Sequence, residues 1–189
     1  MGFGTAPCVR YTVDVRASQF TVQAFASGLV AAIAHSPKIA IRDWTGECEI
    51  GSSLLADASL RVNVKAASLE VLDELRENDR REIHRVMKEE VLETAYYPDI
   101  VFESSQVKTN QLKDDLYRFQ ARGALSLHGI TNDHTFSGQA AFGDNTVRAY
   151  GEFMVRQTDY NIRIASIAGG TLKLQNDLKF SFYIVARKG

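Results

Sequence analysis

Alternation of apolar and polar residues is the pattern that most constrains this chain. In the segment 60–65, every second residue is leucine or valine and the others are charged or amide side chains, which is typical of a β-strand with one buried face. The same period of two recurs over 11–25 and in most of the sequence after Pro98. Many antiparallel strands at short spacing must form a sandwich or a closed barrel to protect their edges. The pattern therefore predicts an all-β fold of about eight strands.

Glycine, asparagine and aspartate divide the strands from one another. Gly143-Asp144-Asn145 is a strong hairpin signal, and we expect a bend at Gly123 because a glycine interrupts a long strand there. The expected strands are 11–25, a hairpin with an irregular crossing within 31–50, then 60–66, 100–104, 117–129, 135–142, 146–156 and 178–186, with turns at 113–115, 131–134, 143–145 and 175–177.

The period changes to that of a helix before Pro98. Ile83 and Val86 begin an apolar stripe at helical spacing, and acidic and basic side chains cover the other positions. Pro98 ends the segment because the residue before a proline avoids helical backbone angles. The sequence predicts one helix over residues 79–95, preceded by less regular turns.

Composition narrows the class of partner. The 189 residues are 45% apolar and carry a formal net charge of −1, which suits a single domain over residues 1–189 and gives no basic excess for nucleic acid or an anionic membrane. We expect a neutral or apolar partner. No segment has the roughly 18 apolar residues of a membrane span, and we see no secretory signal, so we expect a cytoplasmic protein. Cys8 and Cys48 are expected to be free thiols.

An eight-stranded barrel can be solid or hollow. The inward positions mix bulky rings with small residues such as Ala121. The residues alone favour rings and aliphatic groups that interdigitate into a solid core, and they leave a ligand-filled tunnel as the alternative, since empty volume forfeits dispersion contacts. The positions that would line a tunnel are Phe20, Val22, Ala24, Trp44, Val62, Val64, Phe102, Phe119, Ala121, Leu125, Leu127, Phe136, Ala149, Gly151, Phe153, Tyr160, Phe180 and Phe182.

A series of short motifs covers the chain from Tyr11 to Arg187. They are Tyr11-Thr12-Val13-Asp14 with Ser18 and Phe20, Gly46 after Trp44-Thr45, the strand from Leu60 to Lys65 before a charged helix, Tyr97-Pro98-Asp99-Ile100-Val101-Phe102 with Ser104, the segment from Gly123 to Thr131, and the closing strand from Phe180 to Ala186. In this order they resemble the YceI-like family of polyisoprenoid-binding proteins.

The resemblance implies an eight-stranded antiparallel, lipocalin-like barrel with one α-helix packed beside it. A long apolar tunnel would enclose a polyisoprenoid, an isoprenoid quinone or a fatty amide, and the protein would carry or store this ligand. No cofactor or metal is implied, and a homodimer is compatible with such a barrel. Ala17 stands where the family usually has a histidine. Arg156 and Asp159 are candidates either for binding a polar head group or for a structural ion pair.

Four histidines are the side chains best suited to acid–base or metal chemistry near neutral pH. His128 and His134 lie on either side of the expected turn and would bind a metal only if Asp133 or His35 joined them. A hydrogen-bonded structural role is the simpler interpretation, and His84 is expected on the solvated face of the helix. No serine has a nucleophile-elbow motif around it, so we expect no enzymatic activity.

Two other functions remain open at this point. The first is a structural or interaction barrel that binds no ligand. The second, less favoured, is a barrel enzyme that uses His128 or His134 on a lipid-like substrate.

Overall fold

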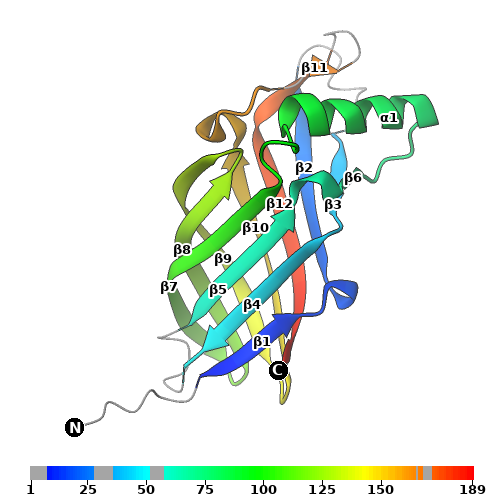
Figure 1. The fold of residues 1–189 in the computed structure, drawn as a ribbon. Coiled ribbons are helices and arrows are strands. Elements are labelled where there is room, and N and C mark those ends of the chain that lie inside the picture. Colours follow the sequence, from blue (N-terminus) through cyan, green and yellow to red (C-terminus); the bar gives the residue numbers. More distant parts are fainter. Residues whose placement is uncertain (1–7, 28–35, 52–57, 165, 168–171) are drawn as a thin grey trace.

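A computed structural model describes residues 8–27, 36–51, 58–164, 166–167 and 172–189. His35 and the first part of the crossing expected after residue 31 lie outside these residues. One antiparallel sheet contains the strands (Figure 1). The strands are β1 (Val9–Val13), β2 (Gln19–Ser27), β3 (Lys38–Ile41), β4 (Trp44–Ile50), β5 (Ser59–Lys65), β6 (Leu69–Val71), β7 (Asp99–Lys113), β8 (Leu116–Leu127), β9 (Ile130–Phe142), β10 (Thr146–Arg156), β11 (Ser166–Ile167) and β12 (Leu172–Lys188).

Eight strands close into a barrel, as the alternating pattern and the family resemblance predict. Their order is β1-β4-β5-β7-β8-β9-β10-β12, and β12 pairs with β1 to complete the ring. The strands β2, β3 and β6 continue the same sheet beyond β12. They are extensions of barrel strands: β2 follows β1, β3 precedes β4, and β6 follows β5 in the chain. The fold is therefore an eight-stranded antiparallel β-barrel with offset strand ends.

A single helical turn, η1 (Val15–Ala17), separates β1 from β2. The Asp14 carboxylate accepts a hydrogen bond from the Ala17 N–H at 3.2 Å, and the Ser18 hydroxyl accepts one from the Val185 N–H at 2.9 Å. These side chains satisfy backbone groups that the interrupted strand leaves unpaired. The strand expected over residues 11–25 is thus two strands with an offset between them.

The helical segment ends four residues earlier than the sequence predicts. α1 (Glu77–Val86) continues into a π-helical turn, η3 (Met87–Val91), so the helical segment covers residues 77–91 and not 79–95. It stops because Glu93 adopts a left-handed backbone conformation with φ of 45°. α1 lies across one end of the barrel, and the C-terminus lies near the other (Figure 1). No helix in the described ranges has the length and apolar character needed to cross a bilayer.

The segment before α1 is a strand, β6, where irregular turns were expected. Two side chains of α1 bind its backbone: the His84 Nε2 accepts the Val71 N–H at 3.1 Å, and the Arg80 guanidinium donates to the Val71 carbonyl at 2.9 Å. The expectation that His84 is merely solvated was therefore wrong, because the ring attaches the helix to the sheet.

Two of the expected turns lie elsewhere. The β8–β9 turn is His128-Gly129, with φ of 51° and 74°, and not residues 131–134, which belong to β9. Positive φ at both central residues is the geometry of a two-residue type I′ hairpin. Residues 175–177 form an irregularity inside β12, where the register with β2 shifts between Leu174 and Leu178. The turns expected at 113–115 and 143–145 are confirmed.

Candidate ligand-binding cavity

The barrel interior contains a cavity of about 510 Å³. Ligand pockets in proteins typically span about 300–1,000 Å³. The cavity extends from Ile83 on α1 to Ala186, near the C-terminus at the opposite end, and every barrel strand contributes to its wall. The interior is therefore hollow, and its own side chains do not fill it.

The lining residues expected from the sequence form the wall of this cavity, with two exceptions. Gly151 and Tyr160 do not reach it. The expected residues that do line it are Phe20, Val22, Ala24, Trp44, Val62, Val64, Phe102, Phe119, Ala121, Leu125, Leu127, Phe136, Ala149, Phe153, Phe180 and Phe182.

Aromatic rings from successive strands make up one side of the wall. The Phe136 ring lies 5.1 Å from that of Phe102 and 5.2 Å from that of Phe153, measured between centroids. Phe153 in turn stacks on Phe180 at 4.9 Å. Aromatic pairs at such separations gain more than burial alone provides. These rings brace one another, which lets the wall stay in place around an open centre.

Gly151 faces a ring and not the open cavity. It lies opposite Gly138 in the β9–β10 pair. A Cβ at Gly151 would stand 2.7 Å from the Phe182 Cζ and 2.7 Å from the Ser137 carbonyl oxygen, which is too close for any side chain. Gly151 therefore shapes the wall by allowing Phe182 to lie against the strand, and a bulky substitution here would disturb the fold before it filled the cavity.

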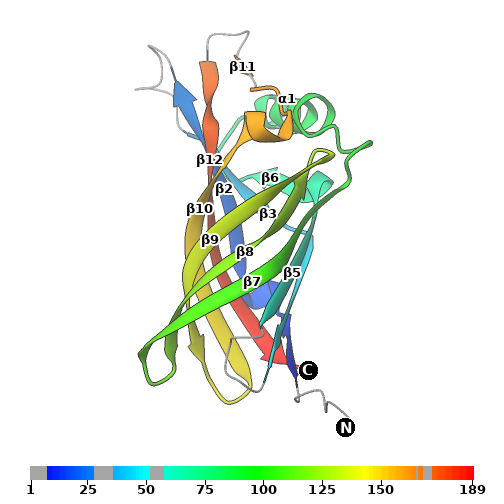
Figure 2. The ribbon, with the colours of Figure 1, turned by 90° about the vertical axis from the view of Figure 1, so that its left-hand side faces the viewer.

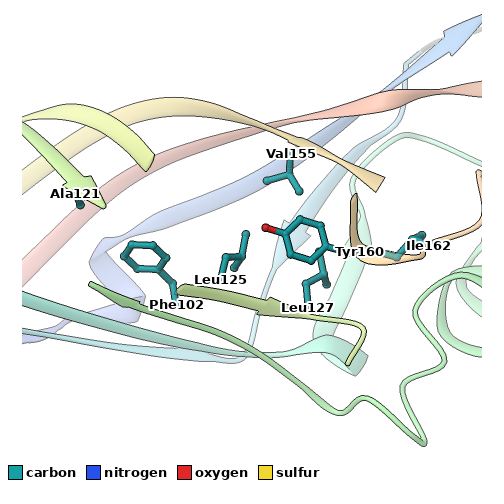
Figure 3. Close-up of a cluster of buried hydrophobic side chains, with 7 residues drawn as sticks. All are labelled: Phe102, Ala121, Leu125, Leu127, Val155, Tyr160 and Ile162. Atoms are coloured by element: carbon teal, nitrogen blue, oxygen red, sulfur yellow. The ribbon is translucent and has the colours of Figure 1, made fainter. Parts of the chain in front are cut away.

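Tyr160 belongs to the helical turn η4 (Gln157–Tyr160), which follows β10. Its ring packs with Leu127 and Val155 in a buried cluster, and is only 3% exposed (Figure 3). Burial raises the pKa of its hydroxyl group. Tyr160 thus packs beside residues of the cavity wall and is not itself among the lining residues, where the sequence placed it.

The sequence interpretation missed part of the wall. β6 contributes Leu69 and Val71, and the helical segment contributes Ile83, Val86 and Met87. The helical stripe was visible in the sequence, but nothing in the local pattern indicated which part of the barrel it covers. The structure shows that the stripe closes one end of the cavity.

The lining carries almost no charge. Among the described residues it includes no lysine or arginine, and its ionisable side chains are Glu47, Glu82, Cys48, Tyr117 and His134. Burial raises the pKa of the Cys48 thiol to about 11, so this group is protonated and unreactive near pH 7. The cavity is suited to an apolar chain and offers no cation to an enclosed anionic group.

Arg156 and Asp159 lie outside the cavity. Both side chains are exposed, and they border a second pocket that shares His134 and Val155 with the cavity lining. No ion pair joins them, and the Asp159 carbonyl accepts a hydrogen bond from the Asn132 side chain at 2.7 Å. Their position supports neither a head-group site inside the cavity nor the buried ion pair considered from the sequence.

His128 joins three separate segments outside the cavity. Its Nδ1 lies 3.2 Å from the Tyr160 carbonyl oxygen and its Nε2 lies 2.8 Å from the Glu93 carboxylate. The Tyr97 ring packs on it with a centroid distance of 4.4 Å. No cluster of three metal-binding side chains occurs in the part of the chain that the structure describes. His128 therefore has a structural role, and it explains why the Tyr97 and His128-Gly129 motifs occur together.

We expect His128→Asn to lower the free energy of unfolding by about 1–3 kcal/mol, because the buried ring loses its packing and hydrogen bonds. Asparagine tolerates the left-handed backbone of this turn, so the loss reports on the ring alone. Urea denaturation measures it. Ligand uptake should not change, since His128 does not line the cavity, and a selective loss of uptake without a loss of stability would contradict this structural role.

The structure is thus a closed, eight-stranded antiparallel barrel with an elongated apolar cavity, and a barrel of this size has room for one small ligand. The sequence of residues 11–186 matches the YceI-like domain family, and the chain belongs to that family. No protein with a curated description matches the sequence.

Solved structures with the same fold share little sequence with this chain. BcnA from Burkholderia cenocepacia has a TM-score of 0.71 at 15% identity, covering 92% of this chain and 98% of BcnA. A polyisoprenoid binding domain from Saccharophagus degradans, implicated in plant cell wall breakdown, has a TM-score of 0.68 at 12% identity, covering 95% and 98%. The YceI protein of Campylobacter jejuni has a TM-score of 0.60 at 17% identity, covering 82% and 87%.

Proposed function

We propose that this protein binds one long apolar or amphiphilic molecule inside the barrel and carries or stores it away from water. The observation that carries the proposal is the apolar cavity of about 510 Å³, which extends along the barrel. The relative from Saccharophagus degradans, described as polyisoprenoid binding, supports a polyisoprenoid or a similar chain as the ligand. A ligand-free structural barrel would have no need of a hollow centre.

Burial of the chain supplies the affinity. Each CH₂ group removed from water contributes about 0.8 kcal/mol, so a chain of ten carbons gains about 8 kcal/mol, which corresponds to micromolar binding before ordering costs. The protein acts by burial and performs no reaction on the ligand. Of the two histidines considered for catalysis, His128 does not reach the cavity.

Trp44 offers a direct test of occupancy. It is the single tryptophan of the chain, lines the cavity, and is 4% exposed. A brominated alkyl chain quenches indole fluorescence on contact, so we expect saturable quenching as such a chain is added. Protein purified without detergent should also carry an apolar molecule, which native mass spectrometry detects and organic extraction identifies.

The matched control moves the reporter to the outer surface. Tyr150 is 46% exposed, so a Trp44→Phe/Tyr150→Trp variant places one indole outside the barrel. We expect no saturable quenching in this variant. A ligand-free mass together with equal quenching of both proteins would refute the proposed function.

A further inference from the structure

α1 covers one end of the cavity but is attached unevenly to the barrel. The helix lies across the end opposite the C-terminus (Figure 1 and Figure 2). It contains no buried residue, although Ile83 and Val86 line the cavity. The turn that follows, η3, is anchored better, because Met87 is buried and the Glu93 carboxylate beyond it binds the His128 Nε2 at 2.8 Å. The helical segment is therefore fixed at its C-terminal end and held by less along α1.

Two side chains join α1 to the edge strand β6. The His84 Nε2 accepts the Val71 N–H at 3.1 Å. The Arg80 guanidinium donates to the Val71 carbonyl at 2.9 Å and to the Asp73 carbonyl at 3.0 Å. β6 ends its side of the sheet, and Val71 is only 1% exposed, so its backbone groups need these partners. We call these three hydrogen bonds the latch.

The opposite end of the cavity is closed more completely. Tyr11, Ile50 and Ala186 form a buried cluster there, and each belongs to a barrel strand with a neighbour on either side. Beside α1, in contrast, Glu82 lines the cavity although its side chain is 61% exposed. Glu47, the other carboxylate of the lining, lies within β4 between β1 and β5, where the sheet is continuous. The cavity therefore approaches the solvent beside α1.

We propose that α1 is a hinged lid over the ligand entrance: it turns about η3 when the latch opens, and the ligand enters and leaves beneath it. η3 is a π-helical turn, and such turns are frequent at functional sites. Residues 72–76, which join β6 to α1, form neither helix nor strand and allow the motion. This inference rests on the proposed function and adds to it the route of the ligand.

His84→Leu removes one hydrogen bond of the latch. Quenching of Trp44 by bromododecane gives the association rate, and a chase with excess dodecane gives the dissociation rate. We expect both rates to rise by roughly tenfold, because the closed lid then leaves the buried Val71 N–H unpaired. The two rates should rise by the same factor, since an open lid serves entry and exit equally, and the dissociation constant should not change.

Two further variants of α1 separate the latch from the general stability of the helix. The side-chain oxygen of His84→Gln accepts a hydrogen bond from a similar position, so this variant should restore both rates. Arg81→Leu is the matched control, because the Arg81 guanidinium pairs with Glu77 of the same helix at 2.9 Å and not with β6. We expect it to leave both rates unchanged.

A covalent tether tests the closed lid directly. Asp73→Cys and Arg80→Cys place two thiols where the arginine now reaches the Asp73 carbonyl, and a reducible bismaleimide joins them. Cys8→Ser removes the exposed native thiol. Both exchange rates depend on the fraction of open lid, so we expect them to fall at least about tenfold in the tethered protein and to recover after reduction of the linker.

Three results would overturn the inference. If the tethered protein exchanges bromododecane as fast as the reduced one, the ligand passes elsewhere, such as through the second pocket beside β9 and β10, and the proposed function still stands. If His84→Leu weakens binding without raising the association rate, the latch is only structural. If bromododecane does not quench Trp44 in the native protein, the proposed function fails together with this inference.

Discussion

Replacing Ala121 with tryptophan will abolish ligand uptake and leave the barrel folded. Ala121 is 0% exposed and lines the cavity at the level of Phe136, its partner on β9. Its methyl group is fully covered by neighbouring side chains, so an indole at this position must push those side chains into the space that a ligand would occupy. We expect the affinity for a long-chain ligand to fall at least about a hundredfold, because several CH₂ groups at about 0.8 kcal/mol each lose their place. Displacement of a fluorescent polyene measures the change.

Ala124→Trp is the matched control on the same strand. Ala124 is exposed on the outer face of β8, three residues further along the strand, so the same indole added there should leave binding unchanged. Overpacking a filled core costs about 1–3 kcal/mol, and the hollow centre should reduce that cost for Ala121→Trp, so circular dichroism should still report a folded barrel. Equal ligand affinity in the two variants would show that the cavity is not where the ligand binds.

The barrel could be predicted because its strands are half buried. Where one face of a strand meets the cavity and the other meets water, apolar and polar residues alternate along the sequence. The strands β5 and β10 therefore lie close to the residues that this pattern predicted. The signal fails where a residue has another reason to be polar. Asn132 and His134 look like turn residues in the sequence, yet they belong to β9, where Asn132 binds the Asp159 carbonyl and His134 lines the cavity.

The cavity wall could be predicted for the same reason, and the hollowness could not. Inward positions follow from the period of two, but whether inward rings meet at the centre depends on how the strands tilt and offset. Gly151 illustrates the limit: its small size suggested open space, whereas the structure places the Phe182 ring against it. The position of the helix could not be predicted either, because the local sequence of α1 does not indicate which part of the barrel the helix covers.

Gly123→Ala should destabilise the barrel by at least about 3 kcal/mol or prevent folding. The register between β7 and β8 shifts between Ser104 and Gln106, opposite Gly123, as in a β-bulge. A Cβ at Gly123 would collide with the Glu103 carbonyl oxygen and would stand 2.6 Å from the Ser104 Cα. These are backbone atoms of the paired strand and cannot rotate away, so the two strands must move apart. Urea denaturation measures the loss, and failure to give soluble protein is the same result in a stronger form.

Gly143→Ala separates this effect from the general cost of replacing a glycine. A Cβ at Gly143 would meet the Thr146 hydroxyl at 3.0 Å, and the next contact, with the Thr146 carbonyl oxygen, is 3.8 Å away. A threonine side chain can rotate, so we expect the free energy of unfolding to change by less than about 1 kcal/mol. If Gly123→Ala were tolerated as well as Gly143→Ala, the close approach of β7 to β8 at the bulge would be wrong.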